Sequence, residues 1–144
     1  MKIFTIGFTK KTAEQFFSRL QQPEIKRLVD VRLNNVSQLA GFAKKEDLRY
    51  FLKAICGLDY VHLLELAPEQ EMLDSFKKKK GDWSQYETAF LKLLERRKIE
   101  STVAQNTMDG ACLLCSEDTA EHCHRRLVAE YLQRHWESVE IIHL

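Results

Sequence analysis

The sequence predicts a single three-layer α/β domain, in which a mostly parallel sheet is covered by helices on both faces. Strand-like apolar runs alternate with segments of helical periodicity along the 144 residues, and this alternation is typical of βαβ units. The expected strands are almost continuously apolar, as they are in sheets buried on both sides. Only two prolines and five glycines interrupt the chain, and no repeat or low-complexity tract is present. We therefore expect one domain over residues 1–144.

Three strands and two helices are expected in the first half of the chain. The strands cover residues 2–7, 28–33 and 60–64. Thr12 and Gln15 form a capping box, in which each side chain satisfies a free amide of the first turn, and this box starts the first helix. The second helix stops at Gly57, and its apolar positions at helical spacing are Leu48, Phe51, Leu52 and Ile55.

The second half alternates in the same way. Pro68 suits the first position of a helix that ends in the run Lys77–Lys80. Ser84 and Glu87 make a capping box for the next helix. The remaining elements are a strand over residues 111–115, a helix over 123–134 and a strand over 139–142.

Composition narrows the classes of function. The net charge is +1, from 22 Lys and Arg against 21 Asp and Glu, so the chain as a whole is not drawn to nucleic acid or to a membrane surface. No apolar run approaches the roughly 20 residues that span a bilayer, and the first residues are too short and strand-like for a signal peptide. We expect a cytoplasmic protein without a membrane partner, with reduced cysteines at Cys56, Cys112, Cys115 and Cys123.

Ligands of parallel α/β sheets bind beyond the carboxyl ends of the strands. The polar residues expected at this edge are Thr9, Asp30, Arg32, His62, Glu65, Cys115, Ser116 and Glu117. Asp30 and Arg32 share one face of their strand, where a charged pair is costly unless each member finds a partner. The pair is either a structural ion pair that ties the strand to a neighbouring loop or a pair that faces a ligand.

Cys112 and Cys115 have the spacing of a C-x-x-C metal or redox motif, but the predicted strand separates them. Residues three apart on a strand point to opposite faces of the sheet. Cys112 is therefore expected to be a small buried hydrophobic residue, as is Cys56. Cys115 ends the strand, so its sulfur can reach the edge of the sheet.

The helix that follows is expected to bring two more polar side chains to this edge. His124 lies on the helical stripe that faces the sheet, and Arg126 lies almost opposite, toward solvent. Arg125 lies on the flank, within reach of an anion at the helix N-terminus. The same field favours the thiolate form of a nearby cysteine.

Three interpretations of this cluster stay open. In the first, Cys115 is a nucleophile or redox-active thiol, with His124 as its base and Arg125 on an anionic substrate. In the second, the cluster binds a metal ion, and its ligand types suit zinc. The metal ligands would be Cys115, His122, Cys123 and His124. Adjacent helical residues diverge by about 100°, so this set needs an unwound first turn. In the third, the polar groups only join the loop to the helix.

Short motifs distributed over the chain resemble a known family. They are Thr5-Ile6-Gly7-Phe8-Thr9, Asp30-Val31-Arg32, Tyr60-Val61-His62, Leu113-Leu114-Cys115-Ser116-Glu117 and Cys123-His124-Arg125. Together they resemble the domain-of-unknown-function 488 family over nearly the whole chain. The resemblance implies an α/β fold with these motifs gathered at one edge of the sheet, and it implies no particular reaction. Thr9 stands where family members often have serine, which keeps a hydroxyl.

We expect an enzyme that acts on a small anionic substrate, phosphate-bearing or nucleotide-like, at the carboxyl edge of the sheet. Cys115 serves as nucleophile or thiolate ligand, and Glu117 and His124 handle protons. The expected substrate-binding residues are Thr9, Asp30, Arg32 and Arg125. The sequence requires no cofactor, and zinc fits the alternative ligand set.

A second function fits the same sequence: a non-catalytic module that binds nucleic acid or protein, with a structural or metal-binding Cys/His cluster. The feature that motivates it is the run Lys77–Lys80. Cations also suit the C-terminal end of a helix dipole, so a solvated helix end is the simpler explanation of the run.

Overall fold

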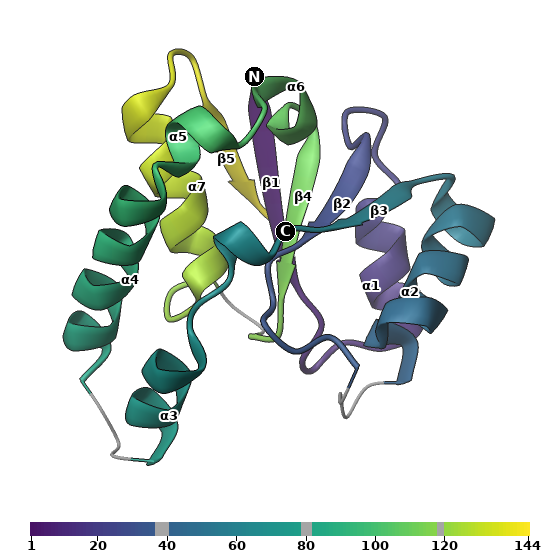
Figure 1. Cartoon of the computed structure of the whole chain (residues 1–144). Coiled ribbons are helices and arrows are strands. Elements are labelled where there is room, and N and C mark those ends of the chain that lie inside the picture. The colour runs from purple at the N-terminus through teal and green to yellow at the C-terminus, as the bar shows by residue number, and fades with distance from the viewer. Residues whose placement is uncertain (37–40, 79–81, 118–119) are drawn as a thin grey trace.

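The computed structural model describes residues 1–36, 41–78, 82–117 and 120–144, and it contains a five-stranded sheet between two layers of helices (Figure 1). The strands are β1 (Lys2–Gly7), β2 (Arg27–Asp30), β3 (Asp59–His62), β4 (Ala111–Cys115) and β5 (Glu140–His143). Their spatial order is β3-β2-β4-β1-β5, and every neighbouring pair is parallel. The predicted fold class is therefore confirmed.

Helices connect the strands, as the alternating pattern predicts. The α-helices are α1 (Ala13–Leu20), α2 (Lys45–Phe51), α3 (Gln70–Lys78), α4 (Trp83–Arg97), α5 (Ile99–Thr102), α6 (Gln105–Met108) and α7 (His124–His135). Single turns of other helix types are η1 (Gly41–Ala43), η2 (Leu52–Cys56) and η3 (Leu64–Leu66). No helix in the described part of the chain is both long and apolar enough to cross a membrane.

The expected helix boundaries are right where the cap residues were identified correctly. The capping box of Thr12 and Gln15 starts α1. Gly57 follows η2 in the left-handed conformation, with φ 67°, as a glycine stop requires. The predicted box of Ser84 and Glu87 is wrong, because Asp82 is the N-cap of α4 and its carboxylate accepts the Ser84 amide.

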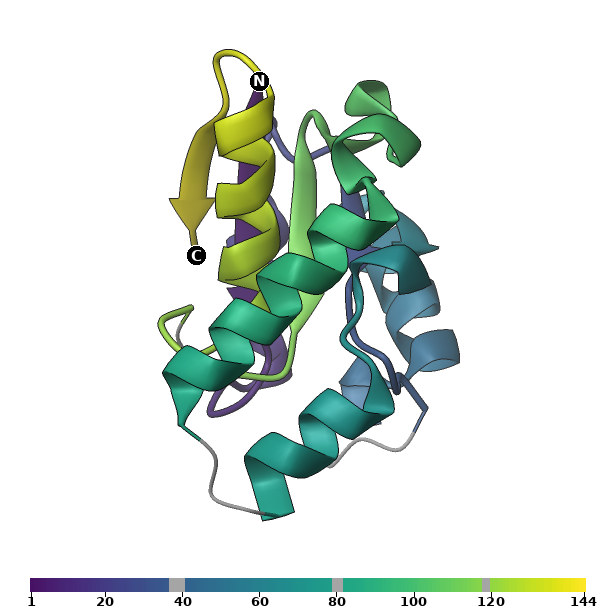
Figure 2. The same cartoon turned by 60° about the vertical axis from the view of Figure 1, so that its left-hand side comes forward.

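Two apolar cores lie on opposite faces of the sheet. Helices α1 and α2 cover one face, where Phe16 and Leu48 pack with Cys112. Helices α4 and α7 cover the other face, where Phe90 and Leu132 are buried in one cluster that also includes Cys115. Figure 2 shows α4 running diagonally between α3 and α7 over this second face. The prediction that the two cysteines of β4 face opposite ways is confirmed.

Strand β2 is shorter than the expected strand over residues 28–33, and the reason bears on the site. After Asp30, the Val31 amide still donates to the Leu114 carbonyl of β4, but the carbonyls of Val31 and Arg32 face side chains. Ring nitrogens of His124 and His62 lie 2.7 Å from the carbonyl oxygens of Val31 and Arg32, respectively. Two histidines thus hold the chain where it leaves the sheet.

Candidate functional site

The site residues expected from the sequence fall into two groups at the carboxyl edge of the sheet. On the side of α1 and α2 lies a group that we call the Asp30 network, formed by Asp30, Arg32, Asn35, Tyr60 and His62. On the side of α7 lies a group that we call the thiol cluster, formed by Cys115, Cys123, His124 and Arg125. The backbone at Val31 links the two groups.

The Asp30 network is built on a buried, two-pronged ion pair. Arg32 donates from Nε to Oδ1 of Asp30 at 2.9 Å and from Nη2 to Oδ2 at 2.8 Å. Asp30 is fully buried and Arg32 is 3% exposed. The same Nη2 donates to the carbonyl of Ala43 at 2.8 Å, so the pair ties β2 to η1. This geometry favours the structural alternative for the pair, because its charges are matched inside the protein.

Neighbouring side chains complete the network. The Tyr60 hydroxyl donates to Asp30 at 2.6 Å, and burial, together with the Asp30 charge, raises the pKa of Tyr60. Asn35 donates to the Tyr60 oxygen at 3.0 Å and lies 3.2 Å from Nδ1 of His62. One polar atom of the network is not satisfied: Nη1 of Arg32 is buried without a hydrogen-bond partner among the described residues.

The thiol cluster contains a disulfide that the sequence did not predict. Cys115 at the end of β4 and Cys123 just before α7 are joined through their sulfurs, and they are 1% and 3% exposed. The expectation of four reduced cysteines is therefore wrong for this pair, because Cys123, at the start of α7, lies against the end of β4. Cys112 is buried as expected, and burial raises its pKa. Cys56 is only half-buried and donates to the Phe17 carbonyl.

Arg125, which was expected on the flank of the helix, is a buried member of the cluster. Its Nη1 lies 3.5 Å from the Cys115 sulfur and donates to the carbonyl of Glu117 at 2.6 Å. The side chain is 1% exposed. Gly7 makes room for this arrangement, since a Cβ there would lie 1.5 Å from the Glu117 oxygen and 2.8 Å from Nη1 of Arg125.

His124 points to the sheet edge, with one ring nitrogen committed to the backbone. Its Nε2 lies 2.7 Å from the Val31 carbonyl, which can only accept, so Nε2 carries the proton and Nδ1 has the lone pair. Burial lowers the pKa of His124 to about 4. The imidazole is therefore neutral near pH 7.

Three of the four expected metal ligands converge. The sulfurs of Cys115 and Cys123 and a ring nitrogen of His124 lie within 4.8 Å of one another. Cys123 is the N-cap of α7 and has an extended backbone, with φ −136° and ψ 139°, so the helix need not unwind to bring it beside His124. His122 does not take part, because its ring stacks on Trp83 with centroids 5.0 Å apart.

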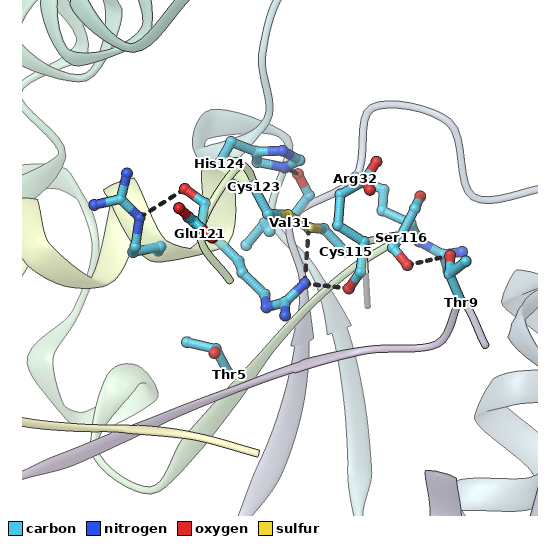
Figure 3. The surroundings of a disulfide bond; sticks show 12 residues. Thr5, Thr9, Val31, Arg32, Cys115, Ser116, Glu121, Cys123 and His124 are labelled. Carbon is cyan, nitrogen blue, oxygen red and sulfur yellow. Dashed lines mark hydrogen bonds between the residues drawn. A yellow bond between two sulfur atoms is a disulfide. The ribbon is translucent and has the colours of Figure 1, made fainter. Parts of the chain in front are cut away.

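Residues at the rim of the cluster are closer to solvent. Thr9 and Glu117 are exposed, and Ser116 is half-buried. The Thr9 hydroxyl and amide both donate to the Ser116 carbonyl, which joins the β1 loop to the β4 loop (Figure 3). Glu117 contributes its backbone carbonyl to the cluster through Arg125, while its side chain is at the surface.

The lysine run cannot be placed at any site. Lys77 and Lys78 end α3, but their side chains, and all of Lys79 and Lys80, lie outside the described residues.

Comparison with known proteins adds one finding. A family model described as Domain of unknown function DUF488 matches residues 12–132. This range contains the Asp30 network and the thiol cluster, and it begins after Thr9. No curated protein and no solved structure matches the chain.

Proposed function

The chain belongs to the DUF488 family, and from the geometry of its own residues we propose that it is an enzyme acting on a small anionic substrate at the thiol cluster. Cys115 supplies the thiolate on which the chemistry depends, as nucleophile or as ligand. His124 supplies a neutral imidazole, and Glu117 at the rim exchanges protons with solvent. A phosphate-bearing or nucleotide-like compound is the class of substrate that suits the cationic groups.

The observation that carries this proposal is the contact between Arg125 and Cys115. A buried guanidinium 3.5 Å from a sulfur stabilises the thiolate relative to the thiol. The N-terminus of α7, where Cys123 is the cap, adds a favourable field of the same sign. A cation and a helix N-terminus beside a sulfur are suited both to thiolate chemistry and to binding an anion.

The rest of the expected binding set contributes unequally. The Nε and Nη2 atoms of Arg32 donate to Asp30 and Ala43, so only its Nη1 remains for an anion. Thr9 lies at the rim, and its hydroxyl donates to the Ser116 carbonyl. The hydroxyl can donate to an anion instead once this bond is released. Asp30 supports Arg32 rather than the substrate, since a carboxylate repels an anion.

We place this activity in the cytoplasm, where thiols are kept reduced. Cytoplasmic disulfides are commonly transient, so Cys115 and Cys123 are proposed to be dithiols during turnover and to close as an oxidised resting form.

A screen of small anionic compounds against the reduced protein tests the proposal. Phosphate and carboxylate esters, with neutral analogues of the same size, are examined for a rise in melting temperature and for chemical change by NMR. We expect anionic members alone to raise the melting temperature of the wild type. Arg125→Gln should lose this rise and Arg125→Lys should keep part of it, because lysine keeps the charge but not the planar fork.

Turnover supplies the second half of the test. Cys115→Ser should lower the rate by at least about 100-fold, the lower range for loss of a catalytic group. Cys112→Ala is the matched control, because this cysteine is on the same strand but faces the opposite core. Binding without turnover would support a binding module instead of an enzyme, and no preference for anions would reject the proposed substrate class.

A further inference from the structure

We propose that Cys115, Cys123 and His124 bind one zinc ion when the two cysteines are reduced, and that the disulfide is the oxidised, metal-free form of the same site. The proposal rests on the proposed function only in its use of the Cys115 thiolate. It assigns that thiolate the role of a metal ligand. It does not depend on which anion the protein binds.

The first support is the convergence of three ligand atoms. Two sulfurs and one imidazole nitrogen lie within 4.8 Å of one another, all at the carboxyl edge of the sheet. On a tetrahedral zinc ion, with Zn–S of about 2.3 Å, two sulfur ligands are about 3.8 Å apart. The three ligand atoms are therefore close enough together for one ion to contact all of them.

The backbone spacing agrees with such a separation. The Cα atoms of Cys115 and Cys123 are 7.3 Å apart. Disulfides usually join Cα atoms about 4.4–6.8 Å apart, so these two backbones are held slightly farther apart than a disulfide prefers. An ion between the sulfurs fills the additional distance.

The outer hydrogen bonds already have the arrangement that metal sites use. A histidine ligand generally donates its second ring N–H to a carbonyl or carboxylate, which fixes the tautomer. Nε2 of His124 makes this contact with the Val31 carbonyl at 2.7 Å, which leaves the lone pair on Nδ1 for a metal. Nη1 of Arg125 donates to the Cys115 sulfur, as amide and guanidinium groups do toward metal thiolates.

Three protein ligands leave one position of a tetrahedral ion open. No fourth Cys, His, Asp or Glu joins the group among the residues that the structure describes. Catalytic zinc sites have this composition, with water or substrate in the fourth position, whereas structural sites are filled by four protein ligands. An anionic substrate held near Arg125 would reach the same position.

The two forms interconvert by a balanced two-electron reaction. A dithiol reductant delivers two electrons and two protons to the disulfide, gives two thiols and becomes a cyclic disulfide. Zinc then binds and releases both thiol protons to solvent. In the reverse direction hydrogen peroxide takes two electrons from the two zinc-bound thiolates, and with two protons from solvent it becomes two molecules of water. The sulfurs join, and the ion leaves.

Cobalt(II) titration of the reduced, metal-free full chain tests the proposal directly. We expect about one equivalent to bind per chain, with thiolate-to-cobalt charge-transfer absorption that zinc removes by displacement. Peroxide should abolish the absorption and regenerate a Cys115–Cys123 bond that peptide mass spectrometry can identify. His122→Gln is the matched control and should bind cobalt as the wild type does, because His122 stacks on Trp83 away from the cluster.

Ligand variants locate the site. Cys123→Ser and His124→Gln should each weaken cobalt binding by more than roughly 100-fold, beyond what loss of an outer hydrogen-bond partner costs. If either variant fails to fold by circular dichroism, the wild-type spectrum and its loss with peroxide decide the question. Absence of charge-transfer absorption in the reduced wild type, or a spectrum unchanged in folded Cys123→Ser, would overturn the proposal. Anion binding that persists without cobalt binding would reject the metal site and leave the proposed function intact.

Discussion

The two sides of the sheet edge solve the problem of buried polar groups in opposite ways. In the Asp30 network, the Asp30 carboxylate pairs with the Arg32 guanidinium. The Tyr60 hydroxyl also donates to this carboxylate, and Asn35 donates to the Tyr60 oxygen. In the thiol cluster, two sulfurs, an imidazole and Arg125 meet, and among the residues that the structure describes no carboxylate joins this group. The first arrangement is paired within the protein except at Nη1 of Arg32, whereas the second is suited to a change of redox state or to a ligand. Similar burial can therefore accompany different roles.

The largest expected effect on stability comes from removing one partner of the Asp30–Arg32 ion pair. Arg32→Met should lower the free energy of unfolding by about 3–5 kcal/mol, because it leaves the Asp30 carboxylate buried without its cation. Urea denaturation measures the change. The double variant Asp30→Leu/Arg32→Met should recover much of the loss, since an apolar pair replaces both charges. A cost below about 1 kcal/mol for the single change would show that the pair is not a structural tie.

Reduction of the disulfide should have the next largest effect. Opening a link between residues 8 apart should lower the free energy of unfolding by about 2–3 kcal/mol, because the unfolded chain regains conformational freedom. Urea denaturation with and without dithiothreitol, in the presence of a chelator, measures it. The Cys115→Ala/Cys123→Ala variant should show no dependence on the reductant. Equal stability of the oxidised and reduced wild type would contradict this prediction.

Crowding at Gly7 should disturb the thiol cluster alone. An added Cβ would overlap the Glu117 carbonyl and approach Arg125, so Gly7→Ala should cost about 1–3 kcal/mol and weaken anion binding. Gly41→Ala is the control, because a Cβ there has no neighbour within 4 Å and should change stability by less than about 0.5 kcal/mol. Thermal unfolding compares the two. If Gly7→Ala changed neither the stability nor the anion binding, the loop at Glu117 would be easily displaced.

The smallest expected effect is the influence of the Arg125 charge on the pKa of His143 in β5. Burial and then the Arg125 charge lower the pKa of His143, whose Nδ1 lies 2.6 Å from the Thr5 hydroxyl. With a folded pKa below the unfolded value of 6.5, the unfolded chain binds more protons in the interval between them. Stability should therefore decrease as the pH falls below about 6.5, and this contribution should be absent in His143→Gln. NMR titration of His143 should give a higher pKa in Arg125→Gln, and an unchanged value would show that the Arg125 charge is screened.

The sequence predicted the strands and their faces better than the contacts at their ends. Period-two alternation separated Cys112 from Cys115, and helical phase brought His124 to the sheet edge, because both follow from backbone geometry alone. Arg125 was assigned to the flank because helical phase ignores how far a long side chain bends, and its guanidinium in fact reaches the Cys115 sulfur. The sequence also predicted that Cys123 and His124 would point about 100° apart, as neighbours on a helix do. This prediction does not apply, because Cys123 is the N-cap and has an extended backbone.

Contacts between residues far apart in the chain could not be predicted from a single sequence. The partners of Asp30 at Tyr60 and Ala43, and the bond from His124 to the Val31 carbonyl, depend on how strands and loops assemble in three dimensions. The cysteine pair is of the same kind, because its residues are separated by a loop whose path no periodicity reveals. The one hint in the sequence was that Cys123 begins a helix whose start was expected beside Cys115.

Turnover by two variants, one from each side of the edge, tests most directly whether the thiol cluster is the functional site. Cys115→Ser and Tyr60→Phe are each a small change, and each removes one group from its own cluster. With an anionic substrate from the screen and the protein reduced, we predict that Cys115→Ser loses at least about 100-fold in turnover. Tyr60→Phe should keep wild-type turnover per folded molecule while losing about 1–2 kcal/mol of stability. Full activity in folded Cys115→Ser, or an equal loss in Tyr60→Phe, would contradict the assignment of function to the thiol cluster.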